Sequence, residues 1–465
     1  MTDYTNYQSP FSWRYGTAPM RKIWSEENKR KTWRRLWVLL AEVQSEFGLT
    51  TAEQVADLRT HMEDIDVARA VAFEKDLRHD VMAEIATYAE QCQVGGGIIH
   101  LGMTSMDIVD NADVLRVRAS LDLLLEQLQE ALTLLLAQME ATADLPVMAF
   151  THLQPAEPTT LGFRFAQYAQ DLWMDWQNLI RLRGDLKGKG LRGAVGTSAS
   201  YTELFGADNL AAFEKRISEK LALPFFAATT QVYPRKQDYD IACALAGLGA
   251  SLYKFAFDLR LLQSPPLGEL AEPFGRKQVG SSAMPFKRNP INTEKMDSLA
   301  RWLAQFPRTA WDNAAHTLLE RTLDDSANRR ITLAEAFLSA DELLRVAVRM
   351  FRGVQIRRDV IARNMAQYGP FAATERVLMA LGKAGANRQV MHERIREHSL
   401  GAWEAVQSGA PNRLVEQITS DAEMLAYLPS ETLLALMDAS TYYGDAVHRT
   451  RQLTQTICAD LAKTR

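Results

Sequence analysis

The chain has 465 residues, of which 47% are hydrophobic and 24% are charged. This balance is typical of a folded globular protein and excludes a largely disordered chain, and the length predicts more than one domain. The formal net charge is −4, so the protein lacks the overall basic character of a nucleic-acid-binding protein.

Three widely spaced cysteines, Cys92, Cys243 and Cys458, form no C-x-x-C pair. Their spacing argues against a disulfide framework and a zinc ribbon. The N-terminal stretch MTDYTNYQSPFSWRYG contains no apolar signal-peptide core, and charged residues interrupt the Leu-rich stretches. These interruptions come before the roughly 18 to 20 apolar residues that a membrane span needs. We therefore expect a cytoplasmic protein that does not cross a membrane.

Long helices are expected through the middle of the chain. Over residues 113–145 there is no Gly or Pro, and apolar residues recur every three or four positions. Such a helix would be on the order of 45 to 50 Å long. Further long helices are expected at 163–183, at 237–262 and at 291–352, the last being kinked or split at Pro307.

Two glycines, Gly247 and Gly249, fall inside the third of these helices, where helices approach closely. Strand signals are nearly absent, apart from a short extended piece at 227–233. The predicted fold is mainly α, with a central bundle of long helices. Since long helices bury an apolar face only against equally long partners, an oligomer that shares its helix bundle is expected.

Glycine and proline punctuation predicts three domains. The glycines of VGGGIIHLG precede the first long helix, and YGP at 368–370 follows the last. The predicted parts are an N-terminal helical domain (1–111), a central bundle domain (112–360) and a C-terminal helical domain (361–465).

Three polar segments leave alternatives open. The basic, glycine-rich segment 181–197 is interpreted as a flexible linker, the alternative being that its glycines border a site. The segment 320–330 is interpreted as a bent helix with surface ion pairs, the alternative being a loop entering a helix, where Arg and Ser donors bind phosphate or carboxylate. In HERIREH, at 392–398, two histidines six positions apart are interpreted as part of a solvated helix.

Among the eight histidines, His79, His100 and His152 stand in polar contexts, yet each taken alone is more typical of a capping or packed residue. The stretch GSSAMPFKRNP, residues 280–290, is more unusual. Its Gly and Pro residues limit the loop to few shapes, and Lys287 and Asn289 suit a carboxylate. With no G-x-S-x-G elbow, a serine hydrolase is unsupported. Taken alone, the stretch is most typical of a mobile loop; the alternative is a lid that brings a hydroxyl and an anion clamp together.

GSSAMPFKRNP resembles the signature loop of the fumarase/aspartase superfamily, whose members release fumarate by β-elimination. Four further stretches are similar to the adenylosuccinate lyase family in particular: LRHDVMAEI, GIIHLGMTSMDIVDN, FTHLQPAEPTT and ERTLDDSANRRITLAEAFL. This resemblance implies a homotetramer with active sites built from three subunits, and no cofactor. It also implies cleavage of adenylosuccinate to AMP and fumarate, and of succinyl-aminoimidazole-carboxamide ribotide to the free carboxamide and fumarate.

The resemblance further implies roles for single residues. Ser281 corresponds to the general base, and His152 to the general acid, with Glu294 as its carboxylate partner. The residues corresponding to ligands of the fumarate carboxylates are Lys287, Asn289, Thr104 and Ser105. Those corresponding to ligands of the nucleotide and succinyl groups are Arg14, Tyr15, Arg78, His79, Asp80, Gln231, Arg321, Ser326 and Arg330.

Two points stay open within this resemblance. Lys295 stands where close relatives have an arginine, and a lysine cannot form the same two-pronged contact. Either Ser281 or Ser282 could be the base; Ser281 is chosen because the family's base lies six residues before the signature lysine. The competing functions are argininosuccinate lyase, aspartase and fumarase, which need no phosphate site, and a helical scaffold without activity.

Overall fold

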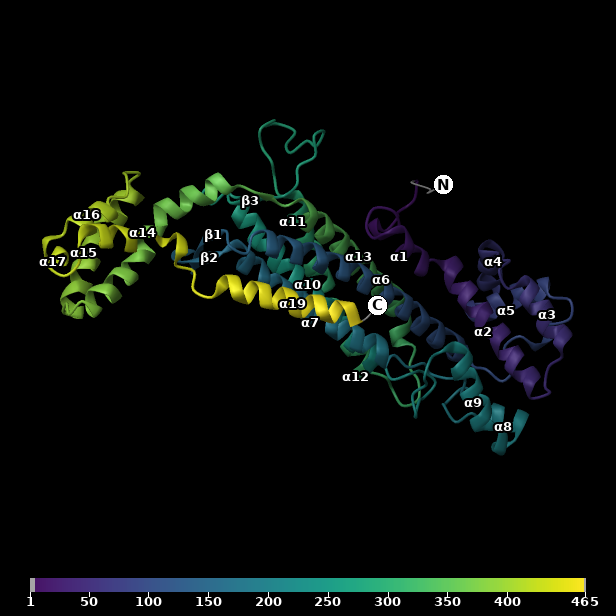
Figure 1. Cartoon of the computed structure of the whole chain (residues 1–465). Helices are drawn as coiled ribbons and strands as arrows, with labels where there is room; N and C mark the ends of the chain where they lie inside the picture. The colour runs from purple at the N-terminus through teal and green to yellow at the C-terminus, as the bar shows by residue number, and fades with distance from the viewer. Residues whose placement is uncertain (1–4, 464–465) are drawn as a thin grey trace. The chain divides into compact units, whose positions relative to one another are not determined.

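The computed structural model describes residues 5–463, and helices dominate it (Figure 1). The mainly α fold class is therefore confirmed. The α-helices are α1 Ala18–Ile23, α2 Glu26–Glu46, α3 Ala52–His61, α4 Val67–Leu77, α5 Asp80–Gln91, α6 Ser105–Ala141, α7 Leu161–Asp185, α8 Ala199–Phe205, α9 Ala207–Leu221, α10 Lys236–Gln263, α11 Ile291–Leu303, α12 Phe306–Ala315, α13 Asp324–Gly353, α14 Arg358–Lys383, α15 Arg388–Gln407, α16 Leu414–Ser420, α17 Ala422–Leu425, α18 Ser430–Leu436 and α19 Ala446–Lys463. Short 3₁₀ helices lie at Pro10–Ser12, Gly96–Ile98 and Ala439–Thr441, and the strands are β1 Pro146–Thr151, β2 Gln154–Thr160, β3 Leu270–Ala271 and β4 Gln355–Ile356.

Contacts between residues divide the chain into two compact units. The first comprises the segments up to Leu128, Met174–Leu252 and Ser298–Val346. The second comprises Gln129–Trp173, Tyr253–Asp297 and the segment from Ala347 onward. The helices α6, α7, α10, α11 and α13 each contribute residues to both units. The three-domain division expected from the sequence stays a prediction.

The expected long helices are present. The first, α6, has 37 residues and begins eight positions before the expected start; α7 and α10 match their expected ranges to within two residues at each end. On α10, a Cβ added at Gly249 would lie 3.3 Å from a methyl carbon of Leu303, so the close helix approach expected there is confirmed. At Gly247 the nearest atom would be 3.6 Å away, an ordinary contact.

The stretch 291–352 is three helices instead of one or two. The break at Pro307 is confirmed, and this proline stands in the first turn of α12, where its missing N–H costs nothing. A second break, at residues 316–323, was not expected. In this break Leu318, Leu319 and Leu323 are all largely exposed, and Leu319 has a φ of 48°.

The prediction of an extended piece at 227–233 is wrong, because this segment forms bends. The longest strands are instead β1 and β2, an antiparallel hairpin. Its two turn residues, His152 and Leu153, have φ values of 52° and 61°, as a tight type I′ turn requires. The sequence did not indicate it, because Pro155 and Pro158 interrupt any strand pattern in β2.

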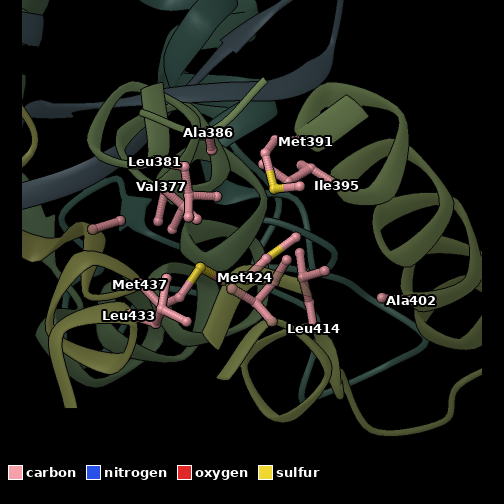
Figure 2. Packing of buried hydrophobic residues seen from close by; sticks show 13 residues of the cluster. Val377, Leu381, Ala386, Met391, Ile395, Ala402, Leu414, Met424, Leu433 and Met437 are labelled. Carbon is pink, nitrogen blue, oxygen red and sulfur yellow. The ribbon is translucent and has the colours of Figure 1, made fainter. Parts of the chain in front are cut away.

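The YGP stretch was expected to follow the last long helix. It lies instead inside a further helix, α14. This helix tolerates Pro370 and packs its apolar face into a core of the second unit. Figure 2 shows Val377 and Leu381 of α14 close to the side chains that α15 to α18 contribute to this cluster, among them Met391, Ile395, Leu414, Met424 and Leu433. Each large apolar side chain buried in this way contributes about 1.5 to 3 kcal/mol to stability.

One helix of the described residues is long and apolar enough to span a membrane by length and composition. This helix is α10, with a mean hydropathy of 1.3 in its most apolar 18-residue window, half of which is buried within the protein. The core helix of a bundle has the same character, so α10 is weak evidence for a membrane span.

Candidate active site

A pocket of about 570 Å³ in the first unit is lined by nine of the residues that the sequence assigned to substrate binding. They come from four separate stretches of the chain: the junction of α4 and α5, the start of α6, the bend before α10, and the start of α13. The nine residues are Arg78, His79, Asp80, Thr104, Ser105, Gln231, Arg321, Ser326 and Arg330.

The junction of α4 and α5 is a sharp turn that presents its side chains to the pocket. Arg78 ends α4 in the left-handed conformation with φ 55°, and His79 caps α5 by accepting a hydrogen bond through Nδ1 from the backbone N–H of Met82 at 3.4 Å. Because Nδ1 is the acceptor, the neutral ring carries its proton on Nε2. That nitrogen lies 3.2 Å from Ser105 Oγ, to which it donates.

The start of α13 contributes the cationic side of the pocket. Arg321 lies in the loop before this helix, while Ser326 and Arg330 stand in its first two turns. Arg330 Nη2 donates to Asp80 Oδ2 at 2.7 Å. The favoured interpretation of 320–330 as a bent helix is therefore wrong, and the loop entering a helix of the alternative is confirmed. That its Arg and Ser donors bind phosphate or carboxylate stays a prediction.

A buried network of charges lies directly behind this wall, and the sequence analysis missed it. Arg321 Nη1 donates to Asp325 Oδ1 at 2.7 Å, and Arg235 Nε donates to Asp325 Oδ2, also at 2.7 Å. Burial alone would raise the pKa of Asp325, but the two guanidinium groups hold it below its usual range. The i, i+4 spacing of Arg321 and Asp325 was the signal that could have indicated this pair.

A third arginine of the network, Arg329, is buried. It donates from Nε to Asp238 Oδ2 and from Nη2 to the Tyr233 hydroxyl, both at 2.8 Å. Burial of such charges is tolerated only when each is paired and hydrogen-bonded. The network therefore fixes the start of α13 against α10.

The glycine-rich segment after α7 is not the flexible linker that was expected. Lys189 is fully buried and donates to Asp107 in the first turn of α6. The same carboxylate accepts hydrogen bonds from the backbone N–H groups of Thr104, Arg192 and Gly193 at 2.9 to 3.1 Å. The segment thus holds the start of α6, where Thr104 and Ser105 line the pocket. None of its own residues lines that pocket, so the alternative that its glycines border a site stays a prediction.

The expected base and its loop lie in the second unit. The loop between β3 and α11 extends away from both elements (Figure 1). Within it, Ser281 Oγ accepts hydrogen bonds from the backbone N–H groups of Ala283 at 3.3 Å and Met284 at 3.1 Å. Ser282 is exposed.

The two ends of the signature stretch are tied together. Asn289 Nδ2 donates to the Gly280 carbonyl oxygen at 2.9 Å. A Cβ added at Gly280 would lie 2.0 Å from the Lys287 carbonyl oxygen, so no other residue fits there. The Asn289 amide, expected as a carboxylate ligand, donates one hydrogen bond to the loop itself, while the Lys287 side chain is exposed.

The expected acid, His152, stands exposed at the turn of the β1–β2 hairpin. In the part of the chain that the structure describes, no hydrogen bond or ion pair joins it to Glu294, its expected partner. Glu294 lies instead in the first turn of α11, 4.0 Å from Arg260 Nη2. Lys295, the next residue of α11, is half-buried.

Arg14 and Tyr15, also expected at the nucleotide, belong to the first unit but do not line the pocket. The chain just after them is fixed to α13: Gly16 N–H donates to Glu342 Oε2 at 3.2 Å, and Thr17 Oγ1 donates to Asp341 Oδ1 at 3.1 Å. Arg14 is exposed and packs on Trp13, with its guanidinium carbon 5.6 Å from the ring centre.

Three other histidines that the sequence singled out, His100, His392 and His398, do not line the pocket. His100 Nδ1 accepts a hydrogen bond from Trp37 Nε1 at 3.0 Å, and burial, with a smaller contribution from His79, lowers the pKa of His100 to about 4. In HERIREH on α15, His392 is exposed, in agreement with the solvated interpretation. That interpretation is wrong for His398, whose Nε2 lies 2.8 Å from the buried Asp421 carboxylate.

The fold is shared with solved enzymes. A 3-carboxy-cis,cis-muconate lactonizing enzyme from Pseudomonas putida matches with a TM-score of 0.85 at 24% identity, covering 97% of this chain and 100% of that one. A fumarate lyase from Mesorhizobium matches with a TM-score of 0.83 at 23% identity, covering 97% of this chain and 99% of that one. Residues 16–303 also match the lyase family. The helical bundle and its signature loop define a lyase of the fumarase/aspartase superfamily.

Sequence relatives narrow the assignment. Residues 370–453 match the C-terminal region of adenylosuccinate lyases. The adenylosuccinate lyases of Saccharomyces cerevisiae and Schistosoma mansoni are 40% and 38% identical to this chain, covering 98% and 97% of it and 95% and 94% of their own lengths. That of Pyrococcus abyssi is 32% identical over 94% of this chain and 95% of its own length. This chain belongs to the adenylosuccinate lyase family.

Proposed function

We propose that this lyase cleaves adenylosuccinate to AMP and fumarate, and succinyl-aminoimidazole-carboxamide ribotide to the free carboxamide and fumarate. The observation that carries the proposal is the pocket of the first unit, which is lined by Arg321, Ser326 and Arg330 and also by Thr104 and Ser105. Arginine and serine donors suit a phosphate, and hydroxyl donors suit a carboxylate. A substrate with a phosphate and a succinyl group needs both kinds of donor.

In the proposed reaction Ser281 is the base that removes a proton from the carbon next to a carboxylate. Negative charge then spreads onto that carboxylate, where Lys287, Asn289, Thr104 and Ser105 stabilise it. The two backbone N–H groups that point at Ser281 Oγ support its choice over Ser282, because they would stabilise the alkoxide form.

As the C–N bond breaks, His152 protonates the departing nitrogen, with Glu294 holding its ring. In this account the nucleotide and succinyl groups are held by Arg14, Tyr15, Arg78, His79, Asp80, Gln231, Arg321, Ser326 and Arg330. The contact expected from Lys295 is weaker than that of an arginine, because an ammonium group is not a planar fork. No step of this reaction calls for a cofactor.

The active form in this proposal is a homotetramer with sites shared between subunits. Two observations support it. The pocket-lining residues include neither His152 nor Ser281, so the pocket by itself contains neither the proposed acid nor the proposed base. The long helices also expose large apolar side chains, including Met174 of α7, Phe257 of α10 and Ile331 of α13, each more than half exposed. Apolar faces of this kind are typical of surfaces that a partner covers.

A cytoplasmic location is part of the same proposal. In the described part of the chain Cys92, Cys243 and Cys458 are all free, as suits a reducing compartment. We also propose that neither nucleic acid nor a membrane is a partner.

The experiment that tests the function offers the purified protein adenylosuccinate, argininosuccinate and malate in parallel, and follows fumarate formation or loss together with the ultraviolet absorbance of the purine. Turnover of adenylosuccinate alone is the expected result. Turnover of argininosuccinate or malate, with none of adenylosuccinate, would assign the chain to a neighbouring branch of the superfamily. No turnover of any of the three would favour a scaffold.

A further inference from the structure

Arg321 is more buried than Arg330, the other arginine expected to bind the nucleotide at this wall of the pocket. Its side chain is 16% exposed, whereas that of Arg330 is 57% exposed. It uses Nη1 to donate to Asp325 Oδ1 at 2.7 Å. Among residues 5–463 its guanidinium makes no other hydrogen bond, so the edge formed by Nε and Nη2 has no protein partner. An edge of this kind matches two oxygens of a phosphate or carboxylate.

Asp325 is in turn held from behind, so it cannot turn away from Arg321. Its side chain is 3% exposed, and its second oxygen accepts from Arg235 Nε at 2.7 Å. Arg235 is 1% exposed and is itself fixed by Asp110, to whose Oδ1 its Nη1 donates at 3.0 Å. A continuous chain of hydrogen bonds therefore runs from buried α6, through Arg235 and Asp325, to the pocket.

We propose that Asp325, held by Arg235, is a positioning residue that aims the free edge of Arg321 at the phosphate of the nucleotide substrate. This inference rests on the proposed function, since it takes the ligand to be a nucleotide monophosphate. Asp325 lies behind Arg321 and acts only through it. The neighbouring Asp324 offers a matched control, since it is an acidic residue in the same first turn of α13 but is exposed.

The test is Asp325→Asn, with Asp324→Asn as its control. Asparagine keeps the size of the side chain, but its neutral amide cannot accept charge-assisted hydrogen bonds from both arginines. Calorimetric titration with AMP and with adenosine separates the phosphate from the rest of the ligand. We expect Asp325→Asn to weaken AMP binding about 10-fold or more while adenosine binding changes less than about 2-fold. We also expect KM for adenylosuccinate to rise more than kcat falls, and Asp324→Asn to resemble the unchanged protein.

The inference is overturned if Asp325→Asn weakens AMP and adenosine equally, as a general distortion would, or weakens neither. If the asparagine variant does not fold, Asp325→Glu takes its place, because it keeps the charge but moves the carboxylate by one methylene. The same AMP-selective loss is then expected from it. A failure of the proposed function is distinct, since the unchanged protein would then fail to turn over adenylosuccinate before any variant is made.

A double variant gives an independent check. Arg321→Lys removes the two-pronged edge while keeping a positive charge. If Asp325 acts through Arg321, adding Asp325→Asn to Arg321→Lys weakens AMP binding little further, and additive losses would contradict the inference.

Discussion

Ser281 Oγ accepts a hydrogen bond from the backbone N–H of Met284 at 3.1 Å, and Gly280, directly before Ser281, is tied through its carbonyl oxygen to Asn289. The signature stretch is therefore a closed loop around one hydroxyl. Ser281 is better placed than its neighbour Ser282 to carry a negative charge, since two N–H donors already point at its oxygen.

The first prediction separates the two serines. Ser281→Ala is expected to lower kcat with adenylosuccinate by about 10²- to 10⁴-fold, the usual effect of removing a general base. Ser282→Ala, the matched control in the same loop, is expected to change kcat by less than about 10-fold. Steady-state kinetics on both variants makes the comparison. A larger loss from Ser282→Ala would transfer the role of base to that residue.

Loop closure carries the second prediction. Gly280→Ala would bring a Cβ to 2.0 Å from the Lys287 carbonyl oxygen, so the loop must open. We expect a loss of turnover comparable to that of Ser281→Ala, because the N–H donors no longer surround Ser281 Oγ. The melting temperature should remain within a few degrees, since the loop is exposed and adds little to any core. An active Gly280→Ala protein would show that the closed loop is not needed.

Lys189 gives a prediction about stability. It is fully buried against Asp107, so Lys189→Met leaves a buried carboxylate without its cation. Removing one partner of such a pair costs about 3 to 5 kcal/mol. Lys187→Met, two positions away at an exposed residue, should cost less than about 1 kcal/mol. Urea unfolding at one fixed protein concentration measures both, and equal midpoints for the two variants would refute the structural role of Lys189.

His100 predicts a pH dependence of stability. Its pKa is lowered to about 4, so the folded protein favours the neutral ring, which accepts from Trp37. We take about 6.5 as the pKa of this histidine in the unfolded chain. The contribution of the neutral ring to the free energy of unfolding is then full above pH 6.5, and it is lost as the pH falls from there through about 4. About 2 kcal/mol of it should disappear between pH 7 and pH 5.

The matched variant is His100→Asn, because asparagine tolerates the left-handed conformation of this position, φ 70°, and does not titrate. The difference in free energy of unfolding between the two proteins should shrink as pH falls from 7 to 5. Parallel pH profiles would mean that His100 is not the titrating group.

The long helices could be predicted because their apolar residues recur at helical spacing over many turns, as in α6, where Leu121, Leu124 and Leu128 are all buried. The β1–β2 hairpin could not be predicted in this way, since its turn depends on the left-handed backbone of His152 and Leu153 and not on an alternating pattern. The break before α13 was missed for a related reason. Exposed leucines at 318, 319 and 323 imitate a helical face that the fold does not bury.

For the site, the motifs predicted which residues line the pocket at the starts of α5, α6 and α13. They did not predict the charges behind it. Asp325, Arg235 and Asp110 are joined only when three distant segments meet, so no spacing in the sequence indicates them beyond the i, i+4 pair of Arg321 and Asp325. For the same reason the buried Lys189 resembled a solvated linker lysine.

The central claim, that the active site is completed by parts of different subunits, is tested most directly by mixing two inactive proteins, Ser281→Ala and His152→Ala. Each alone should be a tetramer without turnover. After co-refolding in equal amounts, hybrid tetramers should recover about a quarter of the activity of the unchanged protein, because that share of sites receives both intact residues from different subunits. Hybrid tetramers, verified by native mass spectrometry, that show no turnover of adenylosuccinate would contradict the account.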